Sequence, residues 1–175
     1  MRGSRELEGW LPTYLRDHLA GSIAAIDIAR RRRDAEPDEP SKTAIVQLIE
    51  DIEEDRARLR DLMSGLGIMP SLWKQTIAAG FSWLGAGRSA LGSAQLNRLR
   101  EFEVLLMGVR GKELLWHTMG RLGLLDPATQ RLLVHRVAIQ RATLEMLHGR
   151  SAVAGVPTQP ADRGPADFVR RTGTP

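Results

Sequence analysis

Two side chains that could do chemistry occupy positions where a packed helix would carry apolar residues. His18 lies between Leu15 and Leu19 in a stretch of helical periodicity, and Asp55 lies inside a second apolar stripe. Such polar groups are costly to bury unless they are hydrogen-bonded or paired. If the chain turns near residue 37 or 38, the two lie within about one helical turn of the same level. We expect them to hydrogen-bond each other or a shared water in the interior, which favours the charged imidazole.

The chemistry open to this pair depends on whether further donors join it. Alone, an imidazole and a carboxylate satisfy each other and help to hold the fold. As metal ligands they need a third and a fourth donor at about 2.0–2.2 Å from the ion. The sequence favours the structural interpretation. A metal or proton-transfer site is the alternative, and the sequence also allows that the two residues never meet.

Further ionisable groups lie in the second half of the chain, on either side of a turn predicted near residue 124. This turn pairs Glu113 with Arg136, as an ion pair near the helix seam, and Glu103 with Glu145. The candidate buried polar residues are therefore His18, Asp55, Glu103, Glu113 and Arg136. The candidate metal ligands are His18, Asp55, Glu103, Glu145 and His148.

Hydrophobic periodicity predicts the helices that must position these groups. They span residues 12–34, 41–64, 70–84, 96–120 and 127–149, to within a few residues. Pro12 suits the first turn of a helix, Ser41 suits an N-cap, and Asp126 followed by Pro127 suits both positions together. Glycines weaken the helix over 96–120 by about 1 kcal/mol each relative to alanine. These are Gly108 and Gly111, and they predict the close approach of another helix.

The predicted fold is all-α, a four-helix bundle, because four main helices have matched lengths. Short links make each sequential pair an antiparallel hairpin. The long middle segment is a crossover whose short amphipathic helix covers the bundle through Trp73, Ile77 and Phe81. Residues 1–150 form one domain. The Gly- and Pro-containing tail over 151–175 is predicted to be disordered and dispensable for folding.

The crossover and the matched helices, from Leu11 to Gly149, resemble the ferritin-like four-helix bundle proteins. Di-iron members carry a Glu on each of two helices and Glu-x-x-His on each of the other two. This chain has one such motif, Glu145 to His148, and no histidine on its second predicted helix. The resemblance therefore implies uncharacterised bacterial relatives without the metal site. No cofactor is predicted, and the metal alternative implies iron, manganese or zinc.

Two helix orders stay open, and they bring different donors to the level of His18 and Asp55. A ferritin-like crossover brings Glu113 and His117, together with Arg136, a cation that opposes a metal. An up-down-up-down order brings Glu103, Glu145 and His148 instead. The presence of Arg136 in the first arrangement favours the structural interpretation.

Composition narrows the functional classes. The 175 residues contain no cysteine, which excludes disulfides, thiolate zinc sites and cysteine nucleophiles. The net charge of +4 comes with interspersed acids, so no nucleic-acid partner is predicted. No run approaches the roughly 18 apolar residues of a membrane-spanning helix, and the start lacks a signal peptide. We expect a soluble cytoplasmic protein.

The predicted function is a binding or structural role without catalytic activity. One alternative is a ferritin-like carboxylate and histidine metal-binding protein. Another is a protein that associates with a membrane surface through residues 68–84, where Trp73 and Trp83 lie among few charges. The partner is not predicted, and the sequence allows a homo-oligomer without requiring one.

Overall fold

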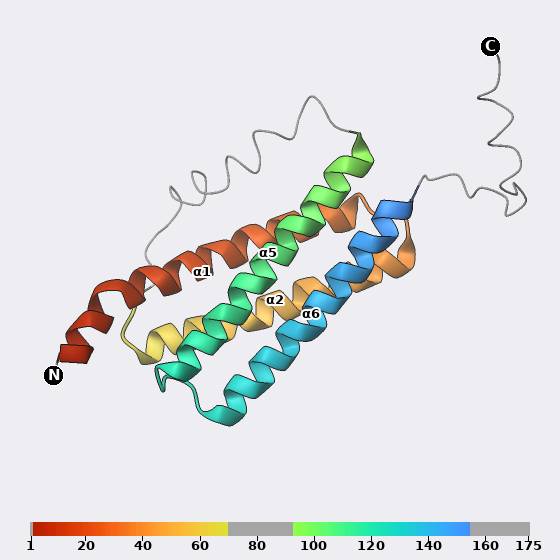
Figure 1. Ribbon diagram of the computed structural model, residues 1–175. Helices are drawn as coiled ribbons and strands as arrows, with labels where there is room; N and C mark the ends of the chain where they lie inside the picture. Colours follow the sequence, from red (N-terminus) through yellow and green to blue (C-terminus); the bar gives the residue numbers. More distant parts are fainter. Residues whose placement is uncertain (1, 70–92, 155–175) are drawn as a thin grey trace, which may run out of the picture.

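The structure is a computed structural model that describes residues 2–69 and 93–154, with side chains from residue 9 onward. These residues form four α-helices and no strand (Figure 1). The helices are α1 (Arg2–Asp34), α2 (Glu39–Gly65), α5 (Ala94–Arg121) and α6 (Pro127–Val153). The prediction of an all-helical bundle is confirmed at this level. The helix predicted over 70–84, with Trp73, Ile77 and Phe81, lies outside the described residues.

The four helices lie side by side (Figure 1), and their buried side chains form one apolar core. α1 packs on α2 and α5, and α6 packs on α5 and α2, so that α2 and α5 lie diagonally opposite. The most deeply buried side chains include Leu15, Ile45, Leu48, Met63, Phe102, Trp116, Leu133 and Leu144. Contacts are denser within the pairs α1–α2 and α5–α6 than between the pairs. We call these the first and the second helix pair.

The residue that begins α2 differs from the predicted one. The Asp38 carboxylate accepts a hydrogen bond from the Ser41 backbone N–H at 2.9 Å, so Asp38 is the N-cap. The prediction that Ser41 caps this helix is wrong, because the acidic cap three residues earlier places Ser41 inside the first turn. Ser41 is instead buried, at 1% exposure.

The start of α6 follows the prediction. The Asp126 carboxylate accepts from the backbone N–H groups of Ala128 and Thr129, and Pro127 is the first helical residue. Gly123, with φ of 69°, takes the left-handed conformation that lets the chain turn between α5 and α6. The helix predicted over 127–149 is confirmed in its beginning, although it extends farther at its end.

Two predicted helix ends are wrong. α1 begins at Arg2, so Pro12 lies inside the helix and not, as predicted from the sequence, in its first turn. A proline removes only one backbone N–H donor, and α1 continues past it. α6 continues to Val153, so the tail does not start at residue 151. Ser151 is buried, and its hydroxyl donates to the Leu147 carbonyl at 2.8 Å. Residues 155–175 lie outside the described residues. Among the described helices, none is both long and apolar enough to cross a membrane.

Candidate functional site

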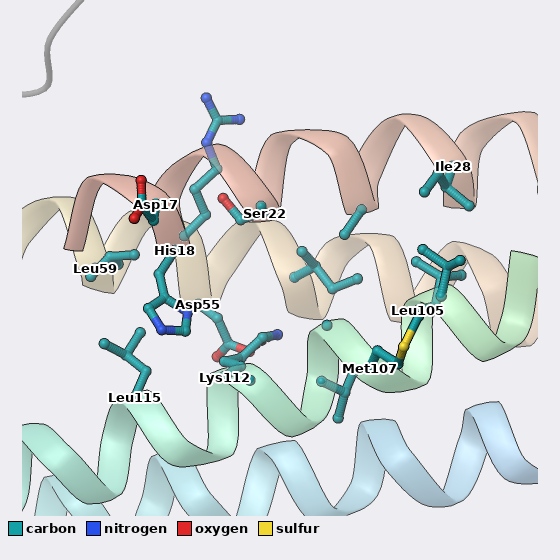
Figure 2. A pocket seen from close by; sticks show the side chains of 18 of the residues that line it. Asp17, His18, Ser22, Ile28, Asp55, Leu59, Leu105, Met107, Lys112 and Leu115 are labelled. Atoms are coloured by element: carbon teal, nitrogen blue, oxygen red, sulfur yellow. Dashed lines mark hydrogen bonds and ion pairs between the residues drawn. The ribbon is translucent and has the colours of Figure 1, made fainter. Parts of the chain in front are cut away.

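A cavity of about 320 Å³ lies between α1 and α5, with α2 on a third side (Figure 2). Most of its walls are apolar, from residues that include Ile28, Ile52, Leu59, Leu105, Val109 and Leu115. His18, Asp55 and Lys112 lie near one another, away from Ile28 and Met107 (Figure 2). The cavity is therefore apolar along most of its length and polar in one region.

Small residues on the facing helices create this space. Gly21 on α1 and Gly108 on α5 line the cavity, and a Cβ atom added at either would meet no other heavy atom within 4 Å. At Gly111 an added Cβ would lie 3.7 Å from Cε1 of His18. Gly108 was predicted to allow close approach of another helix. The structure places cavity space beside it instead, because α1 also contributes small side chains here.

Asp55, at 3% exposure, is the centre of a buried polar cluster that joins three helices. Lys112 Nζ donates to Asp55 Oδ2 at 2.8 Å and to Gln140 Oε1 at 2.7 Å. Gln140 Nε2 donates to the same Asp55 oxygen at 2.8 Å, and Arg136 Nε donates to Asp55 Oδ1 at 3.3 Å. The four residues, called the Asp55 cluster below, connect α2 to both α5 and α6.

The charges of the Asp55 cluster compensate one another. Burial lowers the pKa of the Lys112 ammonium, whereas the attraction and hydrogen bond of Asp55 act to raise it. Arg136 Nη1 also contacts Glu54 at 2.7 Å, which brings a second acid to this cation at the edge of the cluster. Asp55 thus accepts three hydrogen bonds, and a metal would have to displace these donors to reach its oxygens.

His18 on α1 lines the same region of the cavity. Its ring packs edge-on against Tyr14, with ring centroids 4.6 Å apart. Burial lowers the pKa of His18, and the nearby Asp17 carboxylate opposes that effect. The imidazole is therefore neutral at neutral pH, contrary to the expectation that a carboxylate would favour its charged form.

The structure brings His18 and Asp55 to one cavity, but no hydrogen bond joins them among the described residues. Of the two predicted contacts, the direct bond is wrong because Lys112, Gln140 and Arg136 donate to the carboxylate instead, and the shared water stays a prediction. Sequence reasoning did not include Lys112 or Gln140 among the candidate buried polar residues. The signal was present, since Lys112 follows Val109 by three residues and precedes Trp116 by four, which is the spacing of the core-facing stripe.

The remaining predicted polar residues lie elsewhere. Glu113 contacts Arg110 at 2.6 Å and Arg141 at 3.5 Å, so the predicted Glu113–Arg136 ion pair is wrong. Arg136 contacts acids of α2 because it lies on that side of α6, whereas Arg141 lies on the side of α5. The Glu113 side chain is 17% exposed and the Arg136 side chain 20% exposed.

The candidate metal ligands divide between two places. His18 and Asp55 line the cavity, whereas Glu103 lies beside His148 at 3.5 Å between α5 and α6. Glu145 is 60% exposed and lies 3.8 Å from Arg141. Within residues 2–69 and 93–154, no group of three or more histidine or acidic side chains is arranged to hold a metal.

The candidate site is thus an apolar cavity with a neutral imidazole on one wall and a charge-compensated cluster facing it. Trp116, which also lines the cavity, is 1% exposed, and its Nε1 has no hydrogen-bond partner in the described part of the chain. Comparison of the chain with protein-family models, curated proteins and solved structures finds no match.

Proposed function

We propose that this protein is a non-enzymatic binding protein whose cavity between α1 and α5 takes up a small, mainly apolar molecule. The observation that carries the proposal is the volume of about 320 Å³ with apolar walls and one polar region. Cavities of roughly 300–1,000 Å³ with this character accommodate small ligands, and one of about 150 Å³ holds benzene. The expected ligand therefore has about the bulk of two fused aromatic rings or a medium-length alkyl chain.

The polar region favours an uncharged polar group on the ligand. A neutral imidazole offers one donor and one acceptor, and His18 makes no side-chain hydrogen bond to the described residues. The buried Trp116 N–H is a further donor without a partner in the described part. Because the charge of Asp55 is already compensated, an ionic ligand gains nothing from it. A hydroxyl or phenol, which both donates and accepts, fits these groups.

The same contacts support binding rather than catalysis. The Asp55 carboxylate accepts three hydrogen bonds, and the Lys112 ammonium donates two. Neither group is free to act as a general base or a nucleophile, because each would first have to break these bonds. The Asp55 cluster instead holds α2 and α5, which form part of the cavity wall, in place.

The proposal includes the helix order of ferritin-like bundles, with each sequential pair antiparallel. Arg32 near the end of α1 contacts Glu101 in the first part of α5 at 3.4 Å, whereas His18, earlier on α1, lies beside Gly111, farther along α5. These two contacts support antiparallel packing of α1 on α5. No observation in the described residues favours the iron, manganese or zinc alternative. The membrane-surface alternative falls mostly on residues outside them, and a cytoplasmic location stays a prediction.

Binding of a matched ligand series tests this function. We expect 2-naphthol to raise the melting temperature and to bind by calorimetry, with 2-naphthoate clearly weaker because its charge must be desolvated. A ligand at 100 times its dissociation constant stabilises the folded state by about 2.7 kcal/mol.

Cavity-filling variants provide the control for this experiment. Gly108→Leu places its side chain in the cavity and should abolish binding without unfolding the protein, whereas Gly9→Ala, a helical glycine that does not line the cavity, should bind as the parent does. Equal binding by Gly108→Leu, or no response to any member of an alkanol and arenol series, would contradict the proposal.

A further inference from the structure

α6 carries a row of exposed apolar side chains at strict seven-residue spacing. Leu132 and Ile139 are each 49% exposed, Met146 is 41% exposed and Val153 is 67% exposed. The residues three positions after the first three are also exposed, and none of them is an acid, a lysine or an arginine. We call all seven the α6 seam: Leu132, His135, Ile139, Ala142, Met146, Gly149 and Val153. Residues spaced this way share one face of a helix, here over about 31 Å.

Neither the core nor the cavity accounts for this row. The core-facing stripe of α6 consists of other residues, which include Leu133, Val137, Leu144 and Leu147. The cavity is lined by residues of α1, α2 and α5. Single exposed apolar residues are common on protein surfaces, but an apolar heptad row with no charged member is typical of a helix that packs on another helix.

We propose that the α6 seam is the docking surface for a second copy of this chain, packed as two antiparallel α6 helices about a two-fold axis near residue 144. The spacing is self-complementary in this arrangement. Met146 meets Ala142 of the second copy, and Ile139 meets Gly149 of the second copy. The large side chains of Met146 and Ile139 thus each face a small residue, as knobs-into-holes packing requires, and Val153 faces His135 of the second copy. The same contacts occur twice because the axis relates the two copies.

Charges beside the seam favour the antiparallel arrangement. Arg141 and Glu145, with side chains 44% and 60% exposed, lie on one flank close to the proposed axis. Two copies therefore bring two arginines and two glutamates together, with opposite charges adjacent. A parallel pair would instead place Arg131 beside Arg136 of the second copy, which are like charges.

On the other flank, each arginine has an acidic neighbour in its own chain. Arg136 contacts Glu54 at 2.7 Å, and Arg150 lies 3.7 Å from Asp38. The antiparallel pair brings Arg150 toward Arg136 of the second copy, so that these acids separate the two cations. Neither flank opposes the association of two copies.

The molar mass in solution tests the association. We expect light scattering and sedimentation to give twice the 19.4 kDa chain mass at high concentration. Ile139→Glu should raise the dimer dissociation constant at least tenfold, whereas Leu114→Glu should leave it unchanged. Leu114 on α5 is a matched control because it is also 49% exposed and lies in a helix interior. Unchanged circular dichroism would show that both variants fold.

Cysteine cross-linking tests the orientation, because the chain contains no native cysteine. A mixture of Ala142→Cys and Met146→Cys chains should form a mixed disulfide faster than either variant alone. Faster cross-linking by each variant alone would indicate a parallel pair and overturn the arrangement.

Three results would overturn the docking itself. One is a monomer at roughly 500 µM, and another is a dimer insensitive to Ile139→Glu. The third is a monomeric protein in which Ile139→Glu lowers the melting temperature and Leu114→Glu does not. That result would mean that another part of the same chain covers the α6 seam. The ligand experiment is independent of all three, because no seam residue lines the cavity.

Discussion

The Asp55 carboxylate lies in the interior, where Lys112 and Arg136 donate hydrogen bonds to it from two different helices. Ion pairs of this kind add little net stability, since desolvation offsets much of the attraction. Removing one partner is different, because it leaves the other charge buried without compensation. We therefore expect the Asp55 cluster to fix the relative positions of α2, α5 and α6 more than it adds to the free energy of unfolding.

Substitution of the two central residues measures this coupling. Lys112→Met should lower the free energy of unfolding by about 3 kcal/mol, as breaking a buried pair does. The double change Asp55→Leu with Lys112→Met should cost clearly less than the two single changes together. Urea unfolding of the four proteins gives these values.

An exposed ion pair in the same chain serves as the control. Lys42 lies 3.2 Å from Glu39 with 41% of its side chain exposed, and Lys42→Met should change the free energy of unfolding by less than about 1 kcal/mol. Strictly additive effects for Asp55 and Lys112 would show that the two charges do not interact.

His18 should make stability depend on pH in a definite direction. Because burial lowers its folded-state pKa below 6.5, the unfolded chain binds more protons as the pH falls through this region. The His18 contribution is fully present above about pH 6.5 and declines as the pH falls from there to the folded pKa, by at most about 1.4 kcal/mol per pH unit.

Urea unfolding at pH 7.5 and 5.5 checks this dependence. His18→Gln should reduce the loss of stability at pH 5.5 relative to the parent. An identical loss in His18→Gln and in the parent would show that His18 does not titrate in this way.

At the scale of helices, sequence periodicity predicted the described elements well and their junctions less well. The Asp126 cap was recognisable because cap and proline are adjacent, whereas the Asp38 cap was missed because Ser41 is also a good cap residue. The cavity could not be predicted, because it depends on small residues of α1 facing Gly108 across a helix interface. No single helix pattern contains that information.

The two cavity glycines of α5 should be replaceable by alanine with a gain in stability. Alanine costs less than glycine in a helix interior, by roughly 0.5–1 kcal/mol. A methyl group has open space at Gly108 and ordinary contact with His18 at Gly111. Thermal unfolding of Gly108→Ala and Gly111→Ala should show this gain.

Gly9→Ala controls for helix propensity away from the cavity, since its added Cβ also has no neighbour within 4 Å. A loss of stability in Gly108→Ala, beside a gain in Gly9→Ala, would mean that the cavity wall is closer than the structure shows.

At the scale of the whole molecule, two buried polar groups connect the helix pairs at different levels. The Asp55 cluster lies midway along the bundle. Near one end, the fully buried Glu36 carboxylate accepts from Arg98 of α5 at 2.6 Å and lies 3.7 Å from Arg32. Neither connection follows from periodicity, because each joins residues about 60 or more positions apart, and the pattern within one helix does not show which other helix it faces.

The buried charges between the helix pairs also bear on the order of folding. Contacts within a helix pair join residues near in sequence, so we expect them to form early, whereas contacts between the pairs join residues farther apart and carry a larger entropy cost of chain closure. Asp55 and Lys112 must lose their hydration in this second step, before their mutual attraction is complete. Docking of the two pairs should therefore limit the folding rate, and an apolar pair at these positions should accelerate refolding while leaving the helix pairs themselves unchanged.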